Sequence, residues 1–312
     1  MSSAPTIFID GESGTTGLGI RERLSVVPGL QLRSIEDENR KNLAAKKALL
    51  SEVDVVVLCL PDEAARETVA IADDLAASAP RIVDASTAHR VAEGWIFGFP
   101  ELAPEQADAV RCAKRVANPG CYSTGGIALL RPLVDAGIMA RDYPVSINAV
   151  SGYSGGGKGL IEKFESGAAP SFEIYGLGLE HKHLPELQKY TGLTRRPLFT
   201  PSVGNFKQGM LVSIPLHIDT LTGCASSADI EALLVERYRG SDFVRVATAS
   251  EDYATKAGRI SPDALNDTNC MELRVFGNDD RRHAVLMARL DNLGKGASGA
   301  AVQNIKLMLG LT

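Results

Sequence analysis

The stretch TIFIDGESGTTG, residues 6–17, decides the fold class of this chain. Residues 6–10 form a short apolar run that is typical of a buried strand. The next seven residues place glycines at positions 11, 14 and 17, and a helical pattern follows from about residue 18 to residue 26. A strand, a glycine-rich turn and a helix in this order predict the first unit of a dinucleotide-binding domain.

The glycines of this loop would allow the backbone to approach a pyrophosphate closely. A turn without side chains exposes its N–H groups, and the N-terminus of the following helix adds partial positive charge. The spacing G-x-x-G-x-x-G departs from the commoner G-x-G-x-x-G, so a purely structural turn is the alternative. We expect a dinucleotide to contact Gly11, Ser13, Gly14, Thr15, Thr16 and Gly17.

The rest of the first third continues the same alternation. Short apolar runs at 30–34, 53–60 and 81–84 are separated by helical patterns at 42–52 and 62–78. Strands and helices at this spacing predict a parallel sheet of βαβ units, an α/β dinucleotide-binding (Rossmann) domain.

The residues after the second strand do not decide between NAD and NADP. An acid there would favour NAD by binding the ribose 2′-hydroxyl. Glu36 lies nearby, but so do Arg33, Arg40 and Lys41.

The second half has a different pattern of apolar runs and loops, which predicts a second domain of the α+β type. Strand-like runs at 145–150, 210–217 and 270–276 are separated by glycine-rich and polar loops. Residues 297–311 have apolar side chains at helical spacing, and we expect this helix to return to the first domain. The predicted domains are therefore 1–118 with 293–312, and 119–292.

Composition excludes several classes of protein. The chain has 312 residues, of which 45% are hydrophobic and 23% charged, and its net charge is -5. This charge argues against binding of nucleic acid or of an anionic membrane surface. The N-terminus has no signal-peptide pattern, and no apolar run is long enough to cross a bilayer. The five cysteines are scattered, which favours reduced thiols in the cytoplasm over disulfides or a metal site.

Cys121 is the candidate nucleophile. It follows Asn118-Pro119-Gly120 and precedes a helical pattern at 124–135. Proline and glycine impose a turn, and the N-terminus of a helix favours the thiolate. The alternative is a buried cysteine that only fills space, which is how we interpret Cys59 within its apolar strand.

The segment HKHLPE, residues 181–186, is the candidate source of a general base. Histidine commonly takes the proton of a thiol, so His181 and His183 are both candidates. Pro185 is expected in the first turn of a helix, and Glu186 could orient an imidazole ring. A solvated loop is the alternative, and a metal site lacks a third ligand at suitable spacing.

A second glycine-rich loop, SGYSGGGK at residues 151–158, follows a predicted strand. Backbone donors together with a lysine would suit an anionic group of a small-molecule substrate. We expect Ser151, Gly152, Tyr153 and Lys158 to contact that substrate; the alternative is a flexible loop.

These motifs resemble those of the N-acetyl-γ-glutamyl-phosphate reductase family, in its shorter form. The matching segments occur in family order and span nearly the whole chain: residues 11–17, GFPEL at 98–102, NPGCY at 118–122, VSGYSG at 150–155, HKHLPE at 181–186 and DNLGKGA at 291–297. Relatives of this family include aspartate-semialdehyde and glyceraldehyde-3-phosphate dehydrogenases.

The resemblance implies NADPH as cofactor and a homodimer or homotetramer. It implies reduction of N-acetyl-γ-glutamyl phosphate to the 5-semialdehyde, with Cys121 as nucleophile and the base among His181, His183 and Glu186. It also implies that Ser86 and Asn292 contact the cofactor and Asn118 the substrate. Leu184 stands where the longer form has threonine, and residues 200–205 also differ from that form.

Three other functions remain open at this stage. A cysteine hydrolase or acyltransferase would need no hydride donor, and the glycine loop argues against it. A non-catalytic dinucleotide sensor would need neither Cys121 nor the histidines. An aspartate-semialdehyde dehydrogenase would use the same chemistry on a smaller acyl phosphate with an unmodified amine.

Overall fold

The computed structural model describes residues 4–39, 42–248 and 258–311. The chain divides into two compact units, Met1–Pro119 with Ala297–Thr312 and Gly120–Gly296. The first boundary lies one residue later than the predicted one, and the second lies four residues later. The expectations for Arg40 and Lys41 fall outside the described residues.

Unit 1 contains a six-stranded sheet in the order β2-β1-β3-β4-β6-β5, and every pair is parallel. The sheet confirms the predicted Rossmann class. The neighbours of β1 are β2 and β3, so the strand order reverses direction beside the glycine loop, where such sheets bind ligands. The strands are β1 (Thr6–Asp10), β2 (Gln31–Arg33), β3 (Val55–Leu58), β4 (Arg81–Asp84), β5 (Ile96–Phe97) and β6 (Arg115–Ala117).

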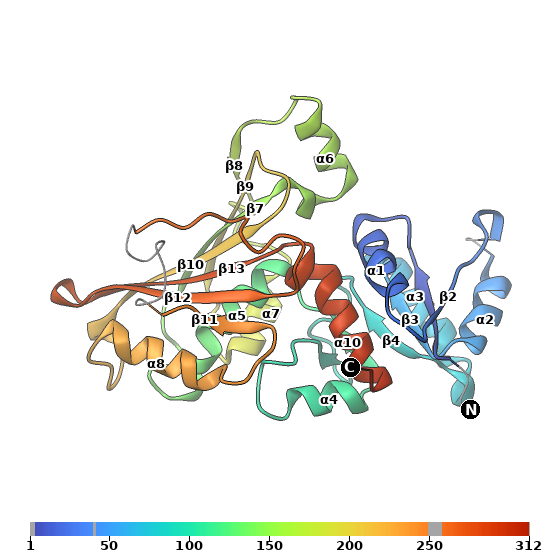
Figure 1. The fold of residues 1–312 in the computed structure, drawn as a ribbon, viewed down its shortest axis with the longest axis horizontal. Helices are drawn as coiled ribbons and strands as arrows, with labels where there is room; N and C mark the ends of the chain where they lie inside the picture. The colour runs from blue at the N-terminus through green and yellow to red at the C-terminus, as the bar shows by residue number, and fades with distance from the viewer. Residues whose placement is uncertain (1–3, 40–41, 249–257, 312) are drawn as a thin grey trace. The chain divides into compact units, whose positions relative to one another are not determined.

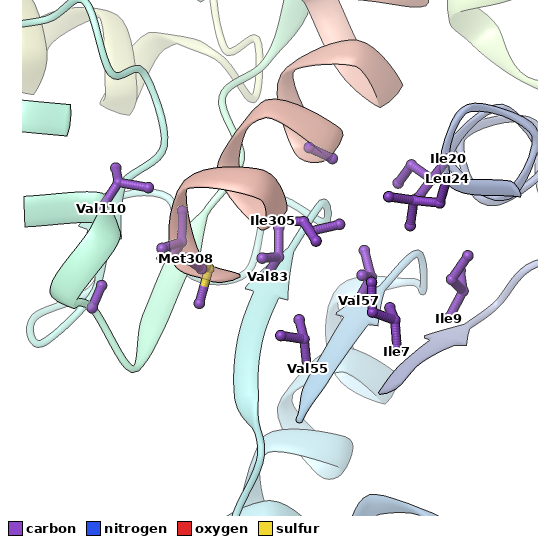
Figure 2. Close-up of a cluster of buried hydrophobic side chains, with 13 residues drawn as sticks. Ile7, Ile9, Ile20, Leu24, Val55, Val57, Val83, Val110, Ile305 and Met308 are labelled. Carbon is purple, nitrogen blue, oxygen red and sulfur yellow. The ribbon is translucent and has the colours of Figure 1, made fainter. Parts of the chain in front are cut away.

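Helices cover both faces of this sheet, because successive residues of its strands point to opposite sides. Ile7, Ile9 and Val57 pack against α1 (Thr15–Ser25), α4 (Gln106–Cys112) and α10 (Gly299–Leu309), which Figure 2 shows. Phe8 and Val56 lie in a second cluster with side chains of α2 (Leu43–Glu52) and α3 (Asp62–Asp73). The C-terminal helix therefore belongs to the core of unit 1, as the sequence predicts.

One predicted helix of unit 1 is wrong in length. The pattern at 62–78 predicts a continuous helix, whereas α3 ends at Asp73 and a separate 3₁₀ turn covers Ala76–Ser78. Ala76 has a φ of 50°, in the left-handed region, so the α-helix cannot continue through it.

Unit 2 contains a mixed seven-stranded sheet in the order β11-β12-β13-β10-β7-β9-β8 (Figure 1). The β10 strand pairs antiparallel with β7 and with β13, whereas β7 pairs parallel with β9. This arrangement confirms the predicted α+β class. The strands are β7 (Ser146–Gly152), β8 (Phe172–Ile174), β9 (Leu198–Gly204), β10 (Met210–His217), β11 (Val244–Val246), β12 (Met271–Asn278) and β13 (His283–Leu290).

The central helix of unit 2 is α5 (Cys121–Asp135), which is almost entirely buried. It packs on β10, β13, α7 (Leu184–Thr191) and α8 (Ser227–Arg237), and α6 (Lys158–Glu165) follows β7. Its glycines at 125 and 126 permit this close approach, since a Cβ at Gly125 would lie 2.9 Å from a methyl group of Val212. The helix begins at Cys121, three residues before the predicted start.

Among the described residues, no helix combines the length and apolar character needed to cross a bilayer.

Candidate active site

Cys121 is the first residue of α5, and the backbone before it is held in place. Gly120 is the N-cap residue, with extended backbone and no side-chain cap. The first N–H groups of a helix have no partner within it, and their partial positive charge stabilises an anion. The Cys121 thiol is partly exposed. This position is suited to a thiolate, as the sequence predicts.

Glu186 holds the turn that presents the thiol. Its Oε2 accepts a hydrogen bond of 3.0 Å from the Gly120 N–H, and its side chain is buried in α7. The contact links the packed helices α5 and α7. The sequence predicts that Glu186 could orient a histidine, whereas this bond joins it to the backbone beside Cys121.

Both histidines of the HKHLPE segment lie at the start of α7, and Pro185 is in its first turn. The His183 N–H donates to His181 Nδ1 over 3.1 Å. Because Nδ1 is the acceptor, the proton of neutral His181 resides on Nε2. His183 is buried, and both rings are in T-shaped contact with the ring of Tyr122.

Cys121 and His181 line the same pocket, which has a volume of about 300 Å³. Ser151 and Gly152 from the second glycine loop also line it, and their contact with substrate stays a prediction. Tyr153, Lys158 and His183 are not among its lining residues. The full lining comprises Cys121, Tyr122, Ser151, Gly152, Gly155, Gly156, Leu160, Glu173, Tyr175, His181, Lys182 and Val203.

Sequence analysis missed one wall of this pocket. Glu173 and Tyr175 line it from β8 and the residue that follows, and Lys182 lies between the two histidines. All three residues of β8 are exposed, and Tyr175 is partly exposed. Alternation along a short strand was the signal available, but four residues are too few to indicate which side faces a pocket.

Two tyrosines form a hydrogen-bonded chain beside Cys121. Tyr175 donates its hydroxyl to Tyr122 over 3.2 Å, and Tyr122 donates to the Ser202 carbonyl over 2.9 Å. Burial raises the pKa of Tyr175 to about 12, and the nearby Cys121 charge acts in the same direction. Tyr175 therefore stays protonated at neutral pH, and its one O–H hydrogen is used in the bond to Tyr122.

The side-chain amide of Asn292 forms hydrogen bonds within unit 2. Its Oδ1 accepts from the Gly209 N–H over 2.8 Å, and its Nδ2 donates to the Ser154 hydroxyl over 2.9 Å. These bonds link the loop after β7 to the loop before β10. Gly296, later in the same motif, must lack a side chain because a Cβ there would lie 2.8 Å from the Cβ of Cys121.

The glycine loop of unit 1 has the geometry that close contact with phosphate requires. Gly11 has a φ of +88°, and a Cβ there would lie 2.3 Å from the Cys59 carbonyl oxygen. A Cβ on Gly17 would lie 2.5 Å from the Gly11 oxygen. The helix α1 begins at Thr15 with Gly14 as N-cap and no side-chain cap. Ser13, Thr15 and Thr16 are exposed or partly exposed.

Two further predicted contact residues use their side chains within unit 1. The Ser86 hydroxyl donates to Asp84 over 2.9 Å and accepts from the Ala88 N–H. Asn118 donates to the Ala297 carbonyl and accepts from Asn304. These side chains position backbone, and their roles toward cofactor and substrate stay predictions.

Asp84 also binds His89. The His89 Nδ1 lies 2.6 Å from the buried Asp84 carboxylate, and its ring stacks on Trp95 at 4.2 Å. The contact places a histidine at the carboxyl end of β4, and no motif in the sequence indicated it.

Comparison with protein families identifies both units. Residues 11–110 match the NAD binding domain of semialdehyde dehydrogenases, and residues 121–292 match the dimerisation domain of the same family. Solved structures agree in fold. Aspartate semialdehyde dehydrogenase II from Vibrio cholerae, complexed with ASA, has a TM-score of 0.71 over 99% of both chains at 16% identity.

Curated relatives are much closer in sequence. N-acetyl-gamma-glutamyl-phosphate reductase of a Chelativorans species is 51% identical over 305 residues, 97% of each chain. The enzyme of Brucella ovis is 50% identical over 311 residues, which is 98% of this chain and 99% of the relative. Reductase 2 of a Nostoc species is 49% identical, with 98% and 97% covered. With this identity over nearly its full length, the chain belongs to the N-acetyl-gamma-glutamyl-phosphate reductase family.

Proposed function

We propose that this protein reduces N-acetyl-γ-glutamyl phosphate to N-acetylglutamate 5-semialdehyde and phosphate with NADPH, a step of arginine biosynthesis. One observation carries the proposal: Cys121, at the N-terminus of α5, lines a pocket together with His181. The relatives that are about half identical to the chain bear the name of this reductase.

Cys121 is the nucleophile of the first step. Its thiolate attacks the γ-carbonyl carbon, a C–S bond forms, and the bond from that carbon to the phosphate oxygen breaks. The start of α5 stabilises the thiolate, and its N–H groups are the donors for the oxygen anion that develops on the carbonyl. The products of this step are a thioester on Cys121 and phosphate.

NADPH, when bound, supplies the hydride that reduces this thioester. The C–S bond then breaks, the semialdehyde leaves and Cys121 returns as the thiolate. The overall reaction consumes one proton, which the departing phosphate takes up. His181 is the residue of the pocket that we assign to this proton transfer: as an imidazolium it gives its Nε2 proton to the phosphate, becomes neutral, and regains a proton from solvent.

The residues of unit 1 fit the cofactor. The loop from Gly11 to Gly17 places glycine backbone at the N-terminus of α1, an 11-residue helix whose N-cap makes no side-chain hydrogen bond. That arrangement accommodates a pyrophosphate. Gly11, Gly14 and Gly17 shape the loop, and Ser13, Thr15 and Thr16 supply hydroxyl groups.

Ser151, Gly152 and Lys182 are the pocket residues best suited to the anionic substrate, since backbone N–H groups and an ammonium bind phosphate or carboxylate. We place the enzyme in the cytoplasm as a homodimer or homotetramer, which the match to a dimerisation domain supports.

The reaction is tested in the reverse direction, with N-acetylglutamate semialdehyde, phosphate and NADP⁺. We expect NADPH to form in this assay and not when aspartate semialdehyde replaces the acetylated aldehyde. Faster turnover of aspartate semialdehyde would contradict the assigned substrate. No change in nucleotide absorbance with either aldehyde would point to a hydrolase or a sensor.

The nucleophile is tested with Cys121→Ser, which should lower turnover on the order of 10³-fold or more. NADPH binding should persist, because the glycine loop lies in the other unit. Cys112→Ser is the matched control, since Cys112 is an exposed cysteine at the end of α4. A Cys121→Ser variant as active as the control would exclude the thioester mechanism.

A further inference from the structure

Three side chains of unit 1 meet beside the glycine loop. Arg21 Nη1 lies 2.7 Å from Glu12 Oε2 and donates to the Ser34 hydroxyl over 3.0 Å. The Ser34 hydroxyl also donates to Glu12 Oε2 over 3.1 Å. Glu12 belongs to the glycine loop, Arg21 to α1, and Ser34 follows β2 directly. The side chains of Arg21 and Glu12 are 42% and 19% exposed to solvent.

Ser34 occupies the position at which Rossmann domains recognise the adenosine ribose. The end of the second strand lies about 20 residues after the glycine loop, and an acid there binds the 2′-hydroxyl of NAD. Here that position carries a neutral hydroxyl. Arg33, the preceding residue, points elsewhere, because its Nη2 pairs with Glu52 at 3.1 Å.

We infer that Arg21 and Ser34 bind the 2′-phosphate of NADPH, and that Glu12 gives up Arg21 when the phosphate arrives. The inference rests on the cofactor of the proposed function. Arg21 uses only Nη1 in its contacts with Glu12 and Ser34, and its Nε and Nη2 donate to no other described residue. A guanidinium with these donors available binds a phosphate through two parallel hydrogen bonds.

Glu12 opposes the phosphate and favours the cofactor that lacks it. A carboxylate beside a phosphate dianion costs free energy, whereas the same carboxylate can accept a ribose 2′-hydroxyl. The preference for NADPH over NADH therefore depends on the competition between Arg21 and Glu12. Removing the charge of each residue should shift the preference in opposite directions.

The test measures binding of 2′,5′-ADP and of 5′-AMP by titration calorimetry, so that turnover is not required. Arg21→Met should weaken 2′,5′-ADP about 10- to 100-fold, the effect of losing a charge-assisted pair, and leave 5′-AMP within about twofold. Arg23→Met is the matched control. It removes a guanidinium from the same helix, where Arg23 donates to Ser298, and should change neither affinity.

Glu12→Gln is the second variant, and it should tighten 2′,5′-ADP several-fold. Equal weakening of both nucleotides by Arg21→Met, or equal affinity for 2′,5′-ADP in the Arg21 and Arg23 variants, would overturn the assignment of Arg21. Weaker 2′,5′-ADP binding in Glu12→Gln would overturn the competition. An unmodified protein that binds 5′-AMP and 2′,5′-ADP equally well refutes the subsite, whereas one that binds neither refutes the proposed cofactor itself.

Discussion

Cys121 differs from Cys59 in its surroundings rather than in its own chemistry. The first lies at the start of α5, where backbone N–H groups favour the thiolate. The second follows β3, where burial and the carboxylates of Asp84 and Asp10 raise its pKa to about 12. Cys59 therefore stays protonated at neutral pH, but its side chain is partly exposed, so it is not the fully buried cysteine that the sequence predicts.

The roles of the two histidines can be distinguished by replacing one imidazole ring at a time. His181→Asn retains an oxygen that can accept the His183 N–H but removes Nε2. We expect kcat to fall about 10²- to 10⁴-fold, the usual contribution of a general acid or base, with little change in melting temperature. Steady-state kinetics and thermal unfolding check the two parts.

His183→Asn should instead lower the melting temperature, because His183 is buried beside Tyr122. His217→Asn, at an exposed position, is the control that should change neither quantity. A stable His183 variant without activity, beside a fully active His181 variant, would assign the proton transfer to His183.

The glycine loop is the element in which steric constraints are strongest. Gly11 lies where the chain leaves β1 and turns past the end of β3, and its missing side chain leaves room for the Cys59 carbonyl. The sequence predicts a glycine requirement here from the motif alone. The neighbouring atoms that impose the requirement belong to the two residues that follow β3.

Two glycines with similar φ angles allow backbone strain to be distinguished from a steric clash of the added Cβ. Gly11 and Gly29 have φ values of +88° and +78°, but nothing lies within 4 Å of a Cβ placed on Gly29. Gly29→Ala should cost about 1–2 kcal/mol of unfolding free energy, the cost of a left-handed alanine. Gly11→Ala should cost more and weaken NADPH binding. Urea titration and cofactor titration measure both effects, and equal losses in the two variants would contradict the steric argument.

At the scale of the molecule, unit 1 is assembled from both ends of the sequence. The last helix, α10, contributes Ile305 and Met308 to a core with residues of β1 and β3 (Figure 2). Unit 2, Gly120–Gly296, is more than half of the chain and lies between these segments in sequence. The stability of the cofactor-binding unit therefore depends on residues that follow the catalytic unit in sequence.

Ile305→Ala tests this dependence. The side chain is fully buried, and its truncation should cost about 2–5 kcal/mol. Trp95 is the single tryptophan of the chain and lies in unit 1, so its fluorescence in urea reports the unfolding of that unit. Lys306→Ala, on the same helix and only partly buried, should leave the transition nearly unchanged. Transitions at the same urea concentration in both variants would show that α10 contributes little to this core.

The sequence by itself determined the elements and the chemistry they carry. The βαβ alternation, the glycine loop and the terminal helix follow from local periodicity and backbone preference, which act within a few residues. The thiol of Cys121 and the pair at His181 and His183 were found in the same way, because short motifs mark them.

The tertiary structure alone decided which of these residues meet. It joined Glu186 to the Gly120 backbone, engaged Asn292 between two loops, and brought Tyr175 into the pocket of Cys121. It also placed Arg21 between Glu12 and Ser34. Contacts of this kind depend on how strands and helices pack across large separations in sequence, and no local pattern encodes that distance.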